Sequence, residues 1–220
     1  MVTTLYLVRH GQTEGGTVKR YKGSIDVPLS QTGIEQVKAV SALINSLAGG
    51  TGNPGNQGSL KAVYASGLKR AQRSAELIAA AHGLMPVVIP GLKERSFGKW
   101  EGMSFDEVMQ SHPDEFEAWA KDPLRFSPVG GESTLEVKDR VQKALDEILC
   151  RHESGDAIAV VAHGGVNRVM LCGLLGMPLE NIFRIEQDFA CLNIIEFWEA
   201  GPVVKLINGS ARTTGGTGCP

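Results

Sequence analysis

The feature that most constrains the fold of this chain is the alternation of short apolar segments with longer amphipathic ones. Short runs rich in β-branched and aromatic residues are typical of buried strands, and apolar residues confined to one face are typical of helices. We expect strands at residues 3–8, 60–65, 86–89 and 157–162, and a closing hairpin of residues 191–198 and 203–207. Helices are expected at residues 31–47, 68–82 and 132–152, and from Gly164 or Gly165. This alternation predicts a three-layer α/β/α sandwich with a mostly parallel central sheet.

A length of 220 residues suits one large α/β domain, which we expect to span residues 1–208. Within it, residues 49–59 contain five glycines and a proline, a composition typical of a flexible surface loop. Residues 104–131 are expected to form a helical insertion over the site, broken at Pro113. Residues 209–220 are small and polar and predict a disordered tail.

The charge balance limits the classes of ligand. A formal net charge of -2 argues against nucleic acid or an anionic membrane as a general partner, so a bound anion would need a few well-placed cations. The apolar run at the N-terminus ends at Arg9, too early for a signal peptide or a membrane span. The four cysteines form no close pairs, which favours free thiols in a reducing compartment. We therefore expect a cytoplasmic protein, for which a homodimer is one assembly that the sequence allows.

Two of the predicted strands end in the same way. The first leads into Arg9-His10-Gly11 and the fourth into His163-Gly164-Gly165. In an open α/β sheet, ligands bind beyond the carboxyl ends of the strands, and glycine there lets backbone amides approach a ligand. One such histidine could merely form a hydrogen bond at a strand end, but two in equivalent positions indicate a reactive site.

Two further polar groups follow the other predicted strands. Arg70 lies in the first turn of the helix after the second strand, close to Ser66, which could donate a hydrogen bond or cap that helix. Glu94 follows the third strand. Taken alone, Arg70 would be interpreted as a solvated helix residue and Glu94 as a surface carboxylate. The nearby Phe97 and Trp100 favour a packed turn around Glu94.

Together these segments resemble the histidine phosphatase superfamily, in the branch that contains cofactor-dependent phosphoglycerate mutases and bacterial phosphatases. The resemblance extends from Leu5 to about Phe197 and depends on four motifs in order: LVRHGQT at 7–13, SGLKRA at 66–71, Glu94 with its FGKWEG sequel, and VAHGG at 161–165. It implies a phosphoglycerate mutase-like fold and a phosphomonoesterase that needs neither a metal nor another cofactor. The implied partner is a small phosphate monoester.

The resemblance also implies a role for each of these residues, and each role is chemically reasonable. Arg9, Arg70 and protonated His163 would neutralise the phosphate oxygens. His10 would attack phosphorus and form a phosphohistidine. Glu94, kept protonated partly by its surroundings, would donate a proton to the leaving oxygen and later activate water.

A second group of residues is implied to lie near the phosphate or the substrate: Thr13, Lys22, Gly23 and Gly164. One departure from the family pattern concerns a hydrogen-bond donor, because many relatives carry Trp-Asn where this chain has Gly15-Gly16. Three residues could replace the missing asparagine: Lys19, Arg20 and Lys22.

Several alternatives differ in chemistry. A phosphatase is favoured over a mutase, because Glu94 is not followed by the Tyr-Tyr-Gly-rich segment of the mutases. Among phosphatases, residues 21–30 and 183–193 resemble α-ribazole-5′-phosphate phosphatases of cobalamin assembly, while a broad-specificity or sugar-phosphate phosphatase remains the alternative. A zinc hydrolase using His10, His163 and Glu94 is disfavoured, since the arginines would repel a dication and no His-x-x-x-His pair is present. A non-catalytic phosphate-binding scaffold on the same fold would be favoured if a catalytic residue were missing. All four are present: His10, Arg70, Glu94 and His163.

Overall fold

A six-stranded mixed sheet forms the centre of the computed structural model, which describes residues 2–15, 20–48 and 60–211. The strand order is β3-β2-β4-β1-β5-β6. The four strands β1 (Thr3–Arg9), β2 (Ala62–Ala65), β3 (Val87–Val88) and β4 (Ala157–Ala162) run parallel. The antiparallel strands β5 (Leu192–Trp198) and β6 (Gly201–Gly209) complete the sheet on one side. The α/β fold class predicted from the sequence is confirmed.

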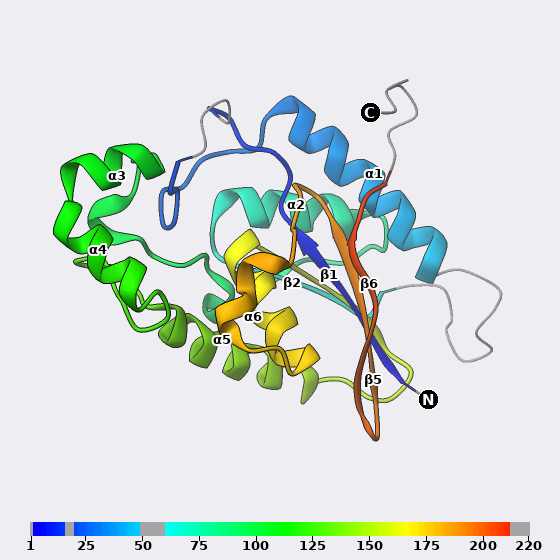
Figure 1. The fold of residues 1–220 in the computed structure, drawn as a ribbon. Coiled ribbons are helices and arrows are strands. Elements are labelled where there is room, and N and C mark those ends of the chain that lie inside the picture. The colour runs from blue at the N-terminus through cyan, green and yellow to red at the C-terminus, as the bar shows by residue number, and fades with distance from the viewer. Residues whose placement is uncertain (1, 16–19, 49–59, 212–220) are drawn as a thin grey trace, which may run out of the picture.

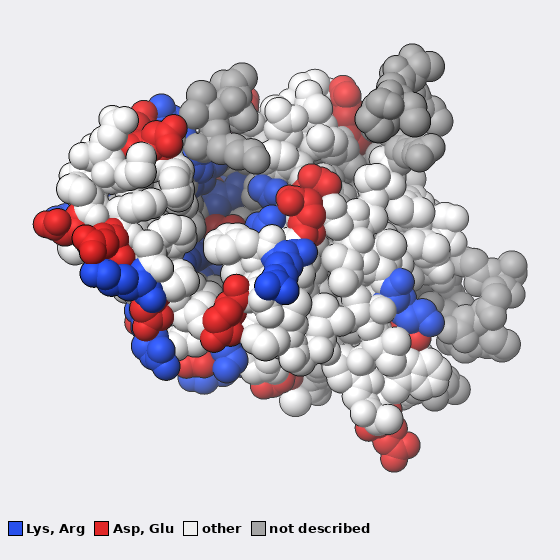
Figure 2. Space-filling model, in the orientation of Figure 1, with Lys and Arg blue, Asp and Glu red and all other residues white. Residues whose placement is uncertain are grey.

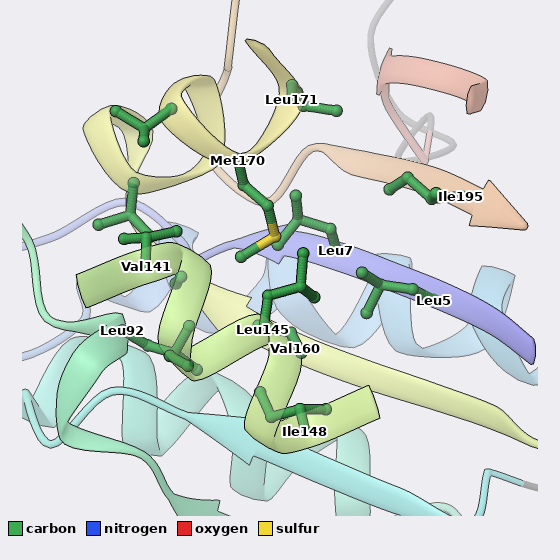
Figure 3. Close-up of a cluster of buried hydrophobic side chains, with 14 of the residues drawn as sticks. Leu5, Leu7, Leu92, Val141, Leu145, Ile148, Val160, Met170, Leu171 and Ile195 are labelled. Atoms are coloured by element: carbon green, nitrogen blue, oxygen red, sulfur yellow. The ribbon is translucent and has the colours of Figure 1, made fainter. Parts of the chain in front are cut away.

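Helices cover both faces of this sheet (Figure 1). The helices α1 (Gln31–Ala48) and α2 (Lys69–Ala80) pack on one face, and α5 (Thr134–Leu149) and α6 (Gly164–Leu175) pack on the other. Because side chains of a strand alternate between faces, β1 serves both cores. Leu5 and Leu7 contact the α5–α6 core, shown in Figure 3, whereas Tyr6 and Val8 contact the α1–α2 core.

Local hydrogen bonds determine where the helices begin. The Ser30 hydroxyl accepts a hydrogen bond of 3.1 Å from the Gly33 amide, as expected for the cap of α1. Ser133 caps α5 and forms a reciprocal capping box with Glu136. Several elements are shorter than predicted: the second strand lacks residues 60 and 61, and the helix predicted at 132–152 covers Thr134–Leu149.

The predicted insertion contains two short helices, α3 (Phe105–Ser111) and α4 (Pro113–Lys121), which we call the cap. Pro113 begins α4 instead of merely interrupting a helix, since the first helical position needs no amide hydrogen. The cap projects beyond the edge of the sheet (Figure 1). Val108 is buried in α3, and every residue of α4 keeps some exposure.

Three single-turn or short 3-10 segments complete the described structure: η1 (Pro90–Leu92), η2 (Gly98–Trp100) and η3 (Leu179–Arg184). Gly209 is the last residue of β6, so the predicted tail of residues 209–220 does not begin at Gly209. Residues 49–59 and 212–220, predicted as loop and tail, lie outside the described part. Among the described residues, no helix is both long enough and apolar enough to cross a bilayer.

Candidate active site

The two strand-end histidines lie next to each other. Arg9 of β1 pairs with Ala162 of β4, so His10 and His163 leave neighbouring strands at the same level. Their ring centroids are 5.1 Å apart, and the two residues are 5 % and 0 % exposed. The sheet therefore brings together the pair that the sequence predicted.

The hydrogen bonding of His10 defines which ring nitrogen can react. Its Nδ1 lies 2.7 Å from the carbonyl oxygen of Gly11. A carbonyl oxygen only accepts, so Nδ1 carries the hydrogen and the lone pair is on Nε2. Burial lowers the pKa of His10 well below its ordinary value, and the charges of Arg9 and Arg70 lower it further. The ring is therefore neutral and nucleophilic at Nε2.

His163 has the opposite arrangement. Its Nε2 lies 2.7 Å from Ser66 Oγ, which itself accepts a hydrogen bond of 3.4 Å from the Leu68 amide. Ser66 is fully buried, and Nε2 is the one acceptor within hydrogen-bond distance of its hydroxyl among the described residues, so the hydroxyl hydrogen is directed at Nε2 and the ring hydrogen is on Nδ1. Within the described residues, this buried Nδ1 has no hydrogen-bond partner.

The surroundings of His163 affect its protonation. Burial lowers its pKa well below the ordinary value, and His10, Arg70 and Arg9 contribute in the same direction. Burial and the neighbouring cations therefore favour the neutral ring, and they oppose the protonated form that the resemblance implies beside phosphate. A phosphate dianion beside it would raise the pKa again, because a nearby opposite charge favours the charged form.

Arg70 is buried, so its interpretation as a solvated helix residue is wrong. Only 2 % of the residue is exposed, and its guanidinium donates to the carbonyl oxygens of Ile25 at 2.7 Å and Gly23 at 2.8 Å. Burial lowers the pKa of Arg70, while the charge of Glu94 opposes the shift. An arginine remains charged under these conditions, so it supplies a permanent cation beside His10.

Arg9 is held between a ring and a carbonyl group. Its guanidinium carbon lies 4.0 Å from the ring centroid of Phe189, and Nη1 donates a 2.5 Å hydrogen bond to the Gln187 carbonyl oxygen. Its buried Nε has no hydrogen-bond partner among the described residues. Burial lowers the pKa of Arg9, and Glu94 is the largest opposing influence. Arg9 thus adds a second cation with an unsatisfied donor.

Glu94 is held against the start of α6. Its two carboxylate oxygens accept hydrogen bonds from the amides of Arg95 at 3.0 Å and Gly165 at 3.2 Å. A Cβ atom at position 165 would lie 2.7 Å from Glu94 Oε1, so only glycine allows this approach. A Cβ atom at Gly164 would lie 3.3 Å from Arg9 Nε. Both glycines therefore let charged groups lie close to the helix backbone.

Of the candidate replacements for the missing asparagine, Lys22 lies at the site. Its Nζ donates to Thr13 Oγ1 and, at 3.2 Å, to the Glu14 carbonyl oxygen. Burial lowers the pKa of Lys22, and Arg70 and Arg9 lower it further, which shows that the three cations are near one another. Arg20 instead pairs with Glu107 at 2.5 Å on the surface. Lys19 and Gly16 lie outside the described residues.

A cavity of about 490 Å³ opens beside these groups. Its lining includes Arg9, Glu94, Gly164 and Gly165. Figure 2 shows it as a hollow beside the cap, with Lys and Arg side chains in its depth and uncharged side chains along the cap. In the described ranges, no three His, Cys, Asp or Glu side chains converge as metal ligands would.

Comparison with known proteins agrees with this geometry. The model of the histidine phosphatase superfamily (branch 1) matches residues 5–210. The chain belongs to this superfamily. The expected fold and enzyme class, a phosphoric monoester hydrolase, are confirmed.

Two relatives of this histidine phosphatase match over most of its length. Phosphoserine phosphatase 1 of Hydrogenobacter thermophilus is 32 % identical over 204 residues, 93 % of this chain and 91 % of that protein. Adenosylcobalamin/α-ribazole phosphatase of Escherichia coli is 29 % identical over 207 residues, 94 % and 96 % of the two chains. A crystal structure of a putative α-ribazole-5′-P phosphatase from E. coli superimposes with a TM-score of 0.82 at 28 % identity, covering 95 % and 97 %.

Sequence reasoning missed some residues that the histidine phosphatase site uses. Phe189 packs against both Arg9 and His10, with ring centroids 5.7 Å apart in the latter pair. Gln187 is fully buried and bonds to Asn167 and Asn193 behind Arg9. The only indication in the sequence was the resemblance of residues 183–193 to α-ribazole phosphatases, to which no chemistry was attached.

Proposed function

We propose that this chain is a metal-independent phosphomonoesterase that transfers the phosphoryl group of its substrate to His10 and then to water. The observation that carries the proposal is the neutral His10 ring, with its lone pair on Nε2, beside Arg9, Arg70 and His163. A phosphate monoester dianion repels nucleophiles, and permanent cations around its outer oxygens reduce that repulsion.

In the first step, the Nε2 lone pair of His10 forms a bond to phosphorus while the ester P–O bond breaks. The guanidinium groups of Arg9 and Arg70 and the Nδ1–H of His163 interact with the three outer oxygens. Thr13, Lys22, Gly23 and Gly164 complete the phosphate site. Lys22 then supplies the donor that the family asparagine would have provided.

In the same step Glu94 protonates the departing ester oxygen, because an alkoxide is a poor leaving group. In the second step a water molecule attacks phosphorus, Glu94 accepts one of its protons, and the P–N bond to His10 breaks. The products are an alcohol and inorganic phosphate, and His10 is regenerated. General acid assistance of this kind contributes about 10²- to 10⁴-fold.

For the substrate we propose α-ribazole-5′-phosphate. The proposal is supported by the names of the E. coli relative and of the structural neighbour, both of which mention α-ribazole. Phosphoserine is the second candidate, because the H. thermophilus relative is named for it. A broader sugar-phosphate specificity and phosphoglycerate mutase activity are the remaining alternatives.

The test of the reaction uses the purified full-length chain and four esters: α-ribazole-5′-phosphate, phosphoserine, ribose 5-phosphate and 3-phosphoglycerate with its bisphosphate primer. We expect phosphate release that survives a chelator, is blocked by vanadate and is abolished in His10→Ala. Quenching without acid should leave ³²P on a histidine ring. Loss of activity with the chelator would support a metalloenzyme, and efficient isomerisation of 3-phosphoglycerate would support a mutase.

We further propose a cytoplasmic enzyme without nucleic acid or membrane partners, which forms a homodimer. The buried free thiols of Cys172 and Cys191 support a reducing compartment, and the net charge of -2 supports the absence of polyanionic partners. Sedimentation of the purified chain tests the homodimer, which a monomer mass would contradict.

A further inference from the structure

Aromatic rings make up much of the wall of the active-site cavity. Six of its lining residues carry aromatic rings: Tyr21, Phe97, Trp100, Phe105, Trp119 and Phe183. They come from distant parts of the chain, namely the loop after β1, η2, the cap and η3. Aromatic rings bind other flat rings through stacked or edge-on contacts and add little polar selectivity.

Phe183 is the least covered ring of this wall. It is 75 % exposed, and it belongs to η3, which leads toward β5. Phe105 and Trp119 line the same cavity from the cap, and Phe105 is 46 % exposed. A large apolar side chain with this exposure, in the lining of a cavity that Glu94 also lines, indicates a ligand contact more than a packing role.

The charged residues on this side of the cavity are already engaged. Arg95 donates to the Glu132 carbonyl oxygen at 2.7 Å, to Thr134 Oγ1 at 3.0 Å and to the Phe126 carbonyl oxygen at 3.0 Å. A guanidinium held in this way has little capacity left for a carboxylate of the substrate.

Arg168 is also largely engaged. Its Nε donates to the Ile185 carbonyl oxygen at 2.7 Å, and its Nη2 pairs with Glu186 at 3.3 Å. The negative charge of Glu186 offsets the positive charge that Arg168 presents to the cavity. A second negative charge on the substrate would gain little here.

We propose that the leaving group of the substrate carries a flat, uncharged ring that stacks on Phe183 and is enclosed by Phe105 and Trp119. This inference rests on the proposed phosphatase function, since it names the chemistry on the leaving-group side of Glu94. Of the esters named above, α-ribazole-5′-phosphate carries such a ring, whereas phosphoserine carries two charged groups instead.

The test compares two esters that share the sugar and the reacting bond and differ only in the ring: α-ribazole-5′-phosphate and ribose 5-phosphate. We expect the native protein to favour the ring-bearing ester in kcat/KM by about tenfold or more. The Phe183→Ala variant should lower this preference about tenfold, mainly through KM, and Phe183→Tyr should preserve it. Because Phe183 is mostly exposed, these variants should fold.

Trp198→Ala is the matched control. Trp198 is also an exposed ring, at 51 %, but it lies at the far end of β5, opposite the strand ends that carry the histidines. Its removal should leave the preference unchanged. Equal turnover of the two esters by the native protein, or a preference that survives Phe183→Ala, would overturn the inference.

Calorimetry separates this inference from the proposed function. His10→Ala should bind α-ribazole-5′-phosphate more tightly than ribose 5-phosphate, and Phe183→Ala in that background should remove the difference. A ring preference in binding combined with turnover by His10→Ala would contradict the phosphohistidine mechanism and leave the aromatic site intact. If His10→Ala bound the two esters with equal affinity while the native protein formed the ³²P-labelled phosphohistidine, only the aromatic site would be contradicted.

Discussion

The hydroxyl of Ser66 and Nε2 of His163 are 2.7 Å apart, and neither residue has measurable exposure. The two residues follow neighbouring strands, β2 and β4, which pair in parallel. Their hydrogen bond keeps the hydrogen of the His163 ring on Nδ1, the nitrogen that has no partner among the described residues. Ser66 therefore controls what His163 offers to the phosphate.

Replacing Ser66 by alanine should reduce kcat/KM about fivefold. The variant removes one hydrogen bond, worth roughly 1 kcal/mol, and frees the ring to adopt the other tautomer. Steady-state kinetics of Ser66→Ala, with Ser66→Thr as the variant that keeps the hydroxyl, measure this effect. Kinetics of Ser66→Ala indistinguishable from those of the native protein would contradict the orienting role.

Lys22→Ala should raise KM about tenfold with a smaller change in kcat. A charge-assisted hydrogen bond to phosphate contributes roughly 1.5 kcal/mol or more to binding. The control is Lys38→Ala, because Lys38 lies on the exposed side of α1. An unchanged KM in Lys22→Ala would remove this residue from the phosphate site.

Gly165→Ala should lower kcat on the order of 10²-fold, because a catalytic group displaced by about 1 Å loses that much rate. The added methyl group would lie 2.7 Å from Glu94 Oε1 and displace the carboxyl group. Gly173→Ala in the same helix is the matched control, since its methyl group would meet only Gln142 Oε1 at 3.8 Å. Vanadate inhibition should remain in Gly165→Ala if the phosphate groups are undisturbed.

The buried histidines should make stability depend on pH. Burial lowers the pKa values of His10 and His163 in the folded protein, so around and below the ordinary histidine value of 6.5 the unfolded chain binds more protons than the folded one. The free energy of unfolding should then fall as the pH drops from 7.5 to 5.5, by up to about 1.4 kcal/mol per pH unit for each histidine.

Urea unfolding at several pH values measures this dependence. His163→Gln should show a shallower slope than the native protein, because one of the two groups has been removed. His112→Gln, at the surface turn between α3 and α4, serves as the control. A slope that His163→Gln does not alter would show that the protonation of this ring is not coupled to folding.

Much of the site could be predicted from the sequence because ligands of an open α/β sheet bind beyond the carboxyl ends of its strands. His10, Ser66 and His163 follow the parallel strands β1, β2 and β4 at the same edge of the sheet, and Glu94 follows η1 just beyond β3, so the alternation of strands and helices was enough to bring them together. Arg70 could be located on its helix, but its burial depends on the carbonyl oxygens of a distant loop.

Other features depend on contacts that no local pattern encodes. Arg9 and its acceptor Gln187 are 178 positions apart, and Phe189 approaches His10 only after the sheet has formed. The pKa of His163 reflects the sum of burial and several neighbouring cations. Such sums depend on distances that exist only in the folded chain.

Few residues of the cap are buried, so the part of the protein that contacts the leaving group is weakly packed. Helix α4 buries none of its residues fully, whereas β1 and β4 lie at the centre of the sheet. Amide hydrogens of the cap should therefore exchange with solvent long before those of β1, because few apolar contacts oppose its local opening. Substitutions in the cap can accumulate at little cost to overall stability, so new leaving groups become accessible in evolution while the phosphoryl-transfer groups are retained.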